Sequence, residues 1–184
     1  MNLPNSLSLF RIILAAVFTL CMTLYHASHA NNLGLIQIAL FCFITAALTD
    51  WLDGFLARKL NLVTSLGKLL DPLADKILVA AAFVGFTELG ICPAWITIAI
   101  LFREFSVTGL RLLLVEKGTV LPADNLGKWK TTTQMVYCVC ILLGYSYQTF
   151  EPLLVGAPYI LYLALGLTLA SGANYLIKGG KALK

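Results

Sequence analysis

The stretch that decides this chain's fold and chemistry is TDWLDGFLARKLNLVTSLGKLLDPLADKILV, residues 49–79. It contains four of the nine acidic residues of the chain, Asp50, Asp53, Asp71 and Asp75. Residues three or four apart share a face of a helix, so Asp50 and Asp53 form one pair and Asp71 and Asp75 another. The segment NLVTSLGK between the pairs is rich in turn and cap formers. Two helices joined by such a turn can bring both pairs together.

Four carboxylates at close quarters repel one another, and each raises the pKa of its neighbours. Divalent cations remove that conflict, and oxygen ligands without His or Cys favour Mg²⁺, Mn²⁺ or Ca²⁺ over zinc. The alternative is a set of solvated surface acids. The flanking segments FCFITAAL and ILVAAAFVGF argue against it, because they are apolar enough to lie in a membrane.

The composition is that of an integral membrane protein with a single domain, residues 1–184. Of the 184 residues, 59% are hydrophobic and only 12% are charged, and the mean hydropathy is +0.86. Soluble domains carry about 25% charged residues. The five cysteines have no C-x-x-C spacing, which favours small apolar fillers over disulfides or a zinc site. We expect the lipid bilayer as a partner and no nucleic acid.

Apolar runs of about 20 residues, the length that crosses a bilayer, predict an all-α bundle of six transmembrane helices. Lys and Arg are absent from the three loops near 27–33, 89–93 and 148–153, and they gather in the segments between. This asymmetry predicts cytosolic N- and C-termini and a multi-pass protein of the cytoplasmic membrane. It places the carboxylates at the cytosolic ends of spans two and three. The predicted spans are about 8–26, 34–57, 69–88, 93–115, 130–150 and 154–177.

The fourth span contains Arg103, Glu104 and Arg111. Charges within a span are costly and usually face a polar cavity or a partner. Arg103 and Arg111 are about 12 Å apart along a helix and about 80° apart around it, so they would line one flank of a cavity. The alternative is a structural pairing of Arg103 with Glu104 or another core acid. Adjacent residues point about 100° apart, which makes the Arg103–Glu104 pair a poor one.

Two further segments carry weaker signals. In DNLGKWKTTTQ, Lys128 and Lys130 lie at a predicted helix start, where they oppose the helix dipole unless an anion lies nearby. Anchoring at the membrane surface is the alternative, and it weighs more for Lys130. Near the N-terminus, the pair Pro4-Asn5 is expected to break the helix, with Ser6 or Ser8 as the cap of the first span.

The pattern D-x-x-D-G-x-x-A-R-x8-G-x-x-x-D-x-x-x-D at residues 50–75 resembles the signature of the CDP-alcohol phosphotransferase family, with every fixed position matched. The resemblance implies CDP-diacylglycerol as donor and two Mg²⁺ or Mn²⁺ ions, with Asp75 as general base. The opening segment NLPNSLSLFRI resembles the family's nucleotide-proximal segment, with Ser8 in place of Thr. The implied metal ligands are Asp50, Asp53, Asp71 and Asp75, and the implied donor-binding residues are Asn5, Ser8, Gly54, Ala57, Arg58, Thr64 and Gly67.

The segments REFSVTGLR and GKWKTTTQ are similar to those of family members that use sn-glycerol 3-phosphate as acceptor. That likeness implies phosphatidylglycerophosphate and CMP as products, with Arg103, Arg111 and Lys128 binding the acceptor phosphate. Phosphatidylinositol-phosphate and cardiolipin synthases remain alternatives, because their acceptors also carry phosphate. The family further implies a homodimer. A divalent cation transporter is the alternative from another class, although a transport site usually lies near the midplane of the membrane.

Overall fold

The structure is a computed structural model that describes the backbone of residues 3–60, 65–116 and 125–183, and the side chains of 6–49, 76–115 and 125–180. Within these ranges the chain forms six α-helices and one short 3₁₀ helix, η1 (Gln148–Phe150). The predicted all-α fold is confirmed. The helices are α1 (Leu3–Ala27), α2 (Leu33–Leu60), α3 (Ser65–Glu88), α4 (Ala94–Glu116), α5 (Asn125–Ser146) and α6 (Pro152–Leu183).

Each predicted apolar run corresponds to one of these helices, but the start of the first was wrong. The expected break at Pro4-Asn5 does not occur, since α1 already begins at Leu3. Proline in a first helical turn lacks an N–H that would be unsatisfied in any case, so it costs little there. Ser8 is therefore no cap, and it lies fully buried inside α1.

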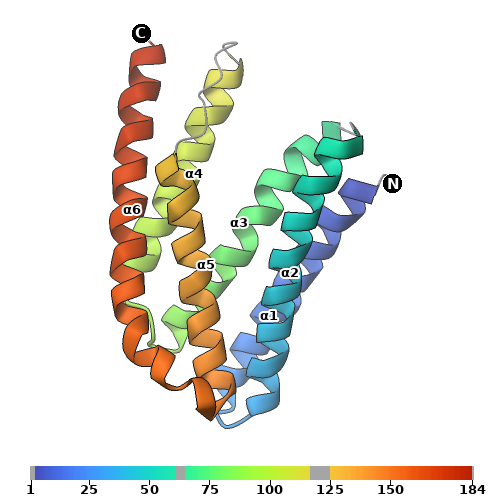
Figure 1. The fold of residues 1–184 in the computed structure, drawn as a ribbon, viewed down its shortest axis with the longest axis vertical. Coiled ribbons are helices and arrows are strands. Elements are labelled where there is room, and N and C mark those ends of the chain that lie inside the picture. The colour runs from blue at the N-terminus through green and yellow to red at the C-terminus, as the bar shows by residue number, and fades with distance from the viewer. Residues whose placement is uncertain (1–2, 61–64, 117–124, 184) are drawn as a thin grey trace.

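The helices run alternately up and down (Figure 1). The connections after α1, α3 and α5 all lie at one end of the bundle, at the bottom of the view. The start of α1 and the end of α6 lie at the opposite end. Helices α1, α2 and α3 form one side of the bundle and α4, α5 and α6 the other, and the two sides diverge toward the end that carries the termini. The three connections that contain no Lys or Arg thus lie together at one end of the bundle.

Aromatic and small residues fill the core between the helices. Phe18 of α1 and Phe43 of α2 have ring centroids 5.9 Å apart. Tyr137 of α5 stacks on Phe83 of α3 at 5.6 Å and meets Phe86 edge-on at 5.9 Å, which joins the two sides of the bundle. Aromatic pairs at these separations add about 0.5–1.5 kcal/mol beyond their burial.

The outer surface of the described residues is strongly apolar. Helices α1 and α6 contain segments long and apolar enough to cross a membrane, Ser6–Ala27 and Pro152–Gly180, and Leu33–Thr49 is a shorter apolar stretch. Large side chains such as Phe41 and Phe102 are 70% and 71% exposed. Surfaces of this kind mark contact with lipid or with another protein.

Candidate active site

The carboxylate motif is carried by the adjoining ends of α2 and α3. Helix α2 continues to Leu60 and α3 begins at Ser65, so both aspartate pairs fall on helical backbone. Five Cα–Cα steps of about 3.8 Å join the two helices, and their ends therefore lie within about 19 Å of each other. Their meeting point is at the end of the bundle that also carries the termini (Figure 1).

The side chains of the motif lie outside the described residues, and the same holds for Asn5. The described side chains contain no group of three or more His, Cys, Asp or Glu that could hold a metal ion. The predicted convergence of the four carboxylates therefore stays a prediction. The residues concerned are Asp50, Asp53, Gly54, Ala57, Arg58, Thr64, Gly67, Asp71 and Asp75.

A cavity lies directly beyond the motif, between α3, α4 and α5. Its volume is about 30 Å³, and it is partly open to the outside. Val79 of α3 lines it, and Val79 follows position 75 by one helical turn. The wall is apolar apart from a group of polar and charged side chains. The lining residues are Lys76, Val79, Ala80, Ile100, Leu101, Glu104, Phe105, Lys130, Thr131 and Gln134.

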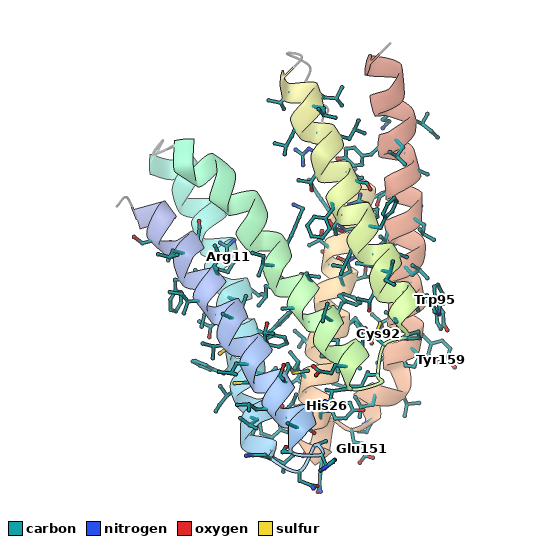
Figure 2. The ribbon with its side chains drawn as sticks, turned by 180° about the vertical axis from the view of Figure 1, so that it is seen from behind. Arg11, His26, Cys92, Trp95, Glu151 and Tyr159 are labelled. Carbon is teal, nitrogen blue, oxygen red and sulfur yellow. The ribbon has the colours of Figure 1, made fainter. Side chains whose placement is uncertain are left out.

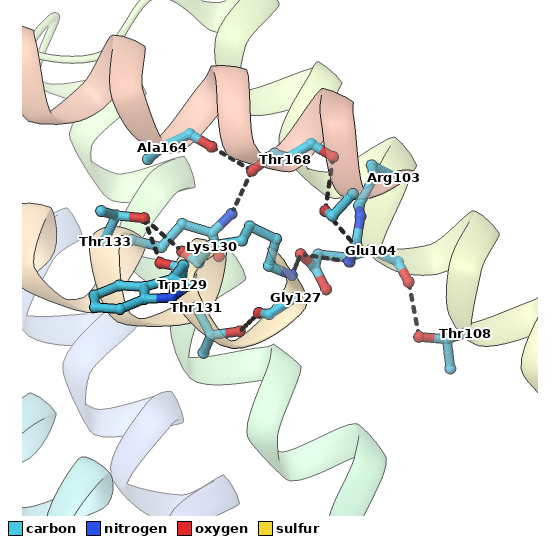
Figure 3. Close-up of polar contacts among 12 residues, drawn as sticks. Arg103, Glu104, Thr108, Gly127, Trp129, Lys130, Thr131, Thr133, Ala164 and Thr168 are labelled. Carbon is cyan, nitrogen blue, oxygen red and sulfur yellow. Dashed lines mark hydrogen bonds and ion pairs between the residues drawn. The ribbon is translucent and has the colours of Figure 1, made fainter. Parts of the chain in front are cut away.

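Glu104 is the centre of the charge network at this cavity (Figure 3). Its Oε1 accepts a hydrogen bond from Nζ of Lys130, which extends from α5. The same oxygen lies 3.6 Å from Nη1 of Arg103. The side chains of Arg103, Glu104 and Lys130 are only 9%, 14% and 5% exposed. Buried charges persist when they are paired and hydrogen-bonded, and this group carries one net positive charge.

The expectation that Arg103 and Glu104 pair poorly was wrong. Their Cβ atoms do diverge around the helix, as adjacent positions must. Both side chains are long and flexible, however, and they curl toward a common point where Lys130 also arrives. Lys130 of α5 makes this geometry possible, and the spacing of residues along α4 could not have predicted its position.

Arg103 is anchored on α6. Its Nη2 donates a hydrogen bond of 2.8 Å to Oγ of Ser171, and its guanidinium carbon lies 5.8 Å from the ring centroid of Tyr175. Gly172 makes room for the stem of Arg103, because a Cβ there would lie 2.9 Å from Cγ of Arg103. Arg103 is thus committed to the α4–α6 interface, although it was assigned to the acceptor phosphate.

The network continues through Gln134 and Thr168, which connect α5 to α6. Nε2 of Gln134 donates to Oγ1 of Thr168 at 3.1 Å, and Oγ of Ser171 donates to the carbonyl of Thr168 at 3.1 Å. Sequence reasoning missed these contacts and left the role of α6 open. A signal was present: Thr168, Ser171 and Tyr175 recur at spacings of three and four on one face of an otherwise apolar helix.

The other predicted site residues with described side chains fall into two groups. Arg111 and Lys128 are exposed, near the end of α4 and the start of α5. Ser8 of α1 is buried, at 0% exposure. Lys130, for which membrane anchoring and a nearby anion were equal alternatives, is 4% exposed and lines the cavity.

The chain resembles known proteins over most of its length. A family profile described as CDP-alcohol phosphatidyltransferase matches residues 1–170. A Bacillus subtilis (strain 168) protein named CDP-diacylglycerol–glycerol-3-phosphate 3-phosphatidyltransferase is 43% identical over 192 residues, covering 100% of this chain and 97% of that protein. A Mycobacterium tuberculosis (strain ATCC 25618 / H37Rv) protein named probable phosphatidylglycerophosphate synthase is 38% identical over 177 residues, covering 96% and 81%.

Proposed function

Because the chain belongs to the CDP-alcohol phosphatidyltransferase family, we propose that it transfers the phosphatidyl group of CDP-diacylglycerol to sn-glycerol 3-phosphate. The products are phosphatidylglycerophosphate and CMP, which makes the protein an enzyme of phospholipid biosynthesis. The observation that carries this proposal is the relative from Bacillus subtilis. It bears the name of this activity, is 43% identical and aligns with 100% of this chain.

The motif at residues 50–75 supplies the donor site in this proposal. Asp50, Asp53, Asp71 and Asp75 are hard oxygen donors in two pairs, a set that suits two Mg²⁺ or Mn²⁺ ions. When bound, such ions neutralise charge on a diphosphate and on the departing CMP. The residues that would contact the donor are Asn5, Ser8, Gly54, Ala57, Arg58, Thr64 and Gly67. Glycine or alanine at three of these positions lets the nucleotide approach the helices closely.

The chemical step needs one base and one nucleophile. Asp75 would take the proton from a terminal hydroxyl of the acceptor. That oxygen forms a new bond to the phosphorus that carries diacylglycerol. The bond from this phosphorus to the bridging oxygen of the diphosphate breaks, and CMP leaves with the electron pair. Lys76, the residue after position 75, already lines the cavity, so an acceptor in its mouth would lie near this base.

The acceptor phosphate requires cations near the mouth of the cavity. Arg111, near the end of α4, and Lys128, near the start of α5, are exposed and could supply these cations. Lys130 lines the cavity itself. Arg103 would act through Glu104, since its guanidinium is bonded to α6. Each charge-assisted hydrogen bond to a poorly hydrated phosphate is worth about 1.5–3 kcal/mol.

We place the enzyme in the cytoplasmic membrane with all six helices spanning and the active site facing the cytosol. Two observations support this placement. The cation-free connections lie together at the end opposite the termini. Trp95 and Tyr159 point outward near that end (Figure 2) and are 57% and 77% exposed, as expected of an aromatic belt at a membrane surface. A homodimer is part of the proposal by family analogy.

The test is an assay of the purified protein with CDP-diacylglycerol, Mg²⁺ and a panel of acceptors. CMP release with sn-glycerol 3-phosphate, loss of activity in EDTA and recovery with Mg²⁺ or Mn²⁺ are expected. Arg111→Ala should raise the KM for sn-glycerol 3-phosphate about 10- to 100-fold with little change for the donor. Preference for an inositol phosphate or for phosphatidylglycerol would assign another acceptor. Cation flux into liposomes without CMP release would indicate a transporter.

A further inference from the structure

We propose that Glu104 selects the acceptor, by accepting a hydrogen bond from the acceptor hydroxyl that does not react. The proposal rests on the proposed function and adds to it a residue that recognises the uncharged hydroxyl group of the acceptor. For sn-glycerol 3-phosphate that group is the secondary hydroxyl at C2. The phosphate and the reacting terminal hydroxyl are left to other residues.

Glu104 occupies an exceptional position among the acidic side chains that the structure describes. The others are Glu88, whose side chain is 39% exposed, and Glu151, which is also exposed. Both lie at the end of the bundle opposite the motif. Glu104 is 14% exposed and lines the cavity beyond the motif. It is therefore the one described carboxylate that an acceptor entering this cavity would meet.

The two oxygens of Glu104 are used unequally. Oε1 faces both Lys130 and Arg103. Oε2 has no hydrogen-bond donor among the residues with described side chains. An ionised carboxylate has about four acceptor sites and no donor of its own, so Glu104 has unused capacity at the cavity. The two cations fix the orientation of its side chain.

The chemistry of this wall matches a hydroxylated phosphate ester. A carboxylate repels phosphate and accepts a hydrogen bond from a hydroxyl, whereas the neighbouring lysines attract phosphate. Lys76 and Lys130 line the same cavity as Glu104. An acceptor with a phosphate at one end and hydroxyls at the other is thus oriented by the wall. An acceptor without the second hydroxyl leaves the carboxylate incompletely satisfied, which is how sites built around hydrogen bonds reject deoxy analogues.

The decisive comparison uses sn-glycerol 3-phosphate and 3-hydroxypropyl phosphate, which lacks only the C2 hydroxyl. Both carry the phosphate and a terminal hydroxyl, so losses in phosphate binding cancel in the ratio of their kcat/KM values. For the unmodified enzyme we expect a ratio of about 10 to 100 in favour of sn-glycerol 3-phosphate, the worth of one hydrogen bond to a charged group. A ratio near one would overturn the proposal without any variant.

The variants then assign the discrimination to a residue. Glu104→Met should collapse the ratio to within about threefold of one. Glu104→Met/Lys130→Met removes the whole ion pair and protects the test against misfolding from an unpaired buried lysine. Glu151→Gln, at the opposite end, should keep the ratio of the unmodified enzyme. If Glu104→Met or the double variant slowed both substrates equally, Glu104 would be a structural residue and the proposal would fail. Absence of CMP release with any phosphate acceptor would refute the proposed function itself.

Discussion

Replacing Gly172 by alanine should disturb the charge network from outside the cavity. The new Cβ would lie 2.9 Å from Cγ of Arg103, whereas carbon atoms in good contact are about 3.5–4.0 Å apart. Either the two helices separate or Arg103 withdraws from Ser171, with which it shares a hydrogen bond of 2.8 Å. Overpacking of this kind costs about 1–3 kcal/mol. Alanine has a higher helix propensity than glycine, which stabilises the helix by about 1 kcal/mol, so the net loss of stability should be up to about 2 kcal/mol.

Gly166 is the matched control on the same helix, because a Cβ there meets no atom within 4 Å. Gly166→Ala should stabilise the protein by up to about 1 kcal/mol. For a chain of this size 1 kcal/mol corresponds to about 2–4 °C in Tm. Thermal unfolding of both variants in detergent micelles should therefore show shifts of opposite sign.

A double-mutant cycle connects the loss to Arg103. Arg103→Ala removes Cγ, so Gly172→Ala in that background should behave like Gly166→Ala. A coupling of about 1–3 kcal/mol is expected between positions 103 and 172, in the range measured for contacting residues. Equal shifts for Gly172→Ala and Gly166→Ala, or a coupling below about 0.5 kcal/mol, would refute the packing argument.

Three other predictions follow from described side chains. Lys130→Met leaves Glu104 with one cation fewer in a buried site and should destabilise the protein by about 3–5 kcal/mol. Lys128 is on the exposed surface, so Lys128→Met should change the stability by less than about 0.5 kcal/mol. Similar Tm values for the two variants would contradict the pairing of Lys130 with Glu104. Burial raises the pKa of the Cys92 thiol, which is 2% exposed and receives a hydrogen bond of 3.4 Å from Thr97. The neutral thiol should therefore persist at pH 8. In a variant that keeps Cys92 as its sole cysteine, maleimide should label Cys92 only after unfolding. In the control variant, a cysteine that replaces the exposed Ala94 should react at once. In intact cells, Asn31→Cys and Glu151→Cys should react with an impermeant reagent and Lys128→Cys only after permeabilisation; external labelling at position 128 would reverse the topology.

The amino-acid sequence by itself determined the helices and the chemistry of the motif. Long apolar runs must satisfy their backbone groups internally, so they form helices wherever they later pack. The spacing of Asp50, Asp53, Asp71 and Asp75 is likewise local, because helical periodicity alone places each pair on one face. The family signature is read from the same positions. Convergence of the four carboxylates remains a prediction from that pattern.

Only the tertiary structure decided what surrounds the cavity. Lys130 of α5 reaches Glu104 of α4 through their long side chains. Arg103 meets Ser171 across 68 positions of sequence, because α4 packs against α6. No rule of spacing along one helix connects such residues, since the crossing of the helices sets which side chains meet. The same packing explains why position 172 must be glycine, where the stem of a buried arginine passes. Local periodicity fixes the face on which a residue lies, and the contacts between helices determine what that residue does.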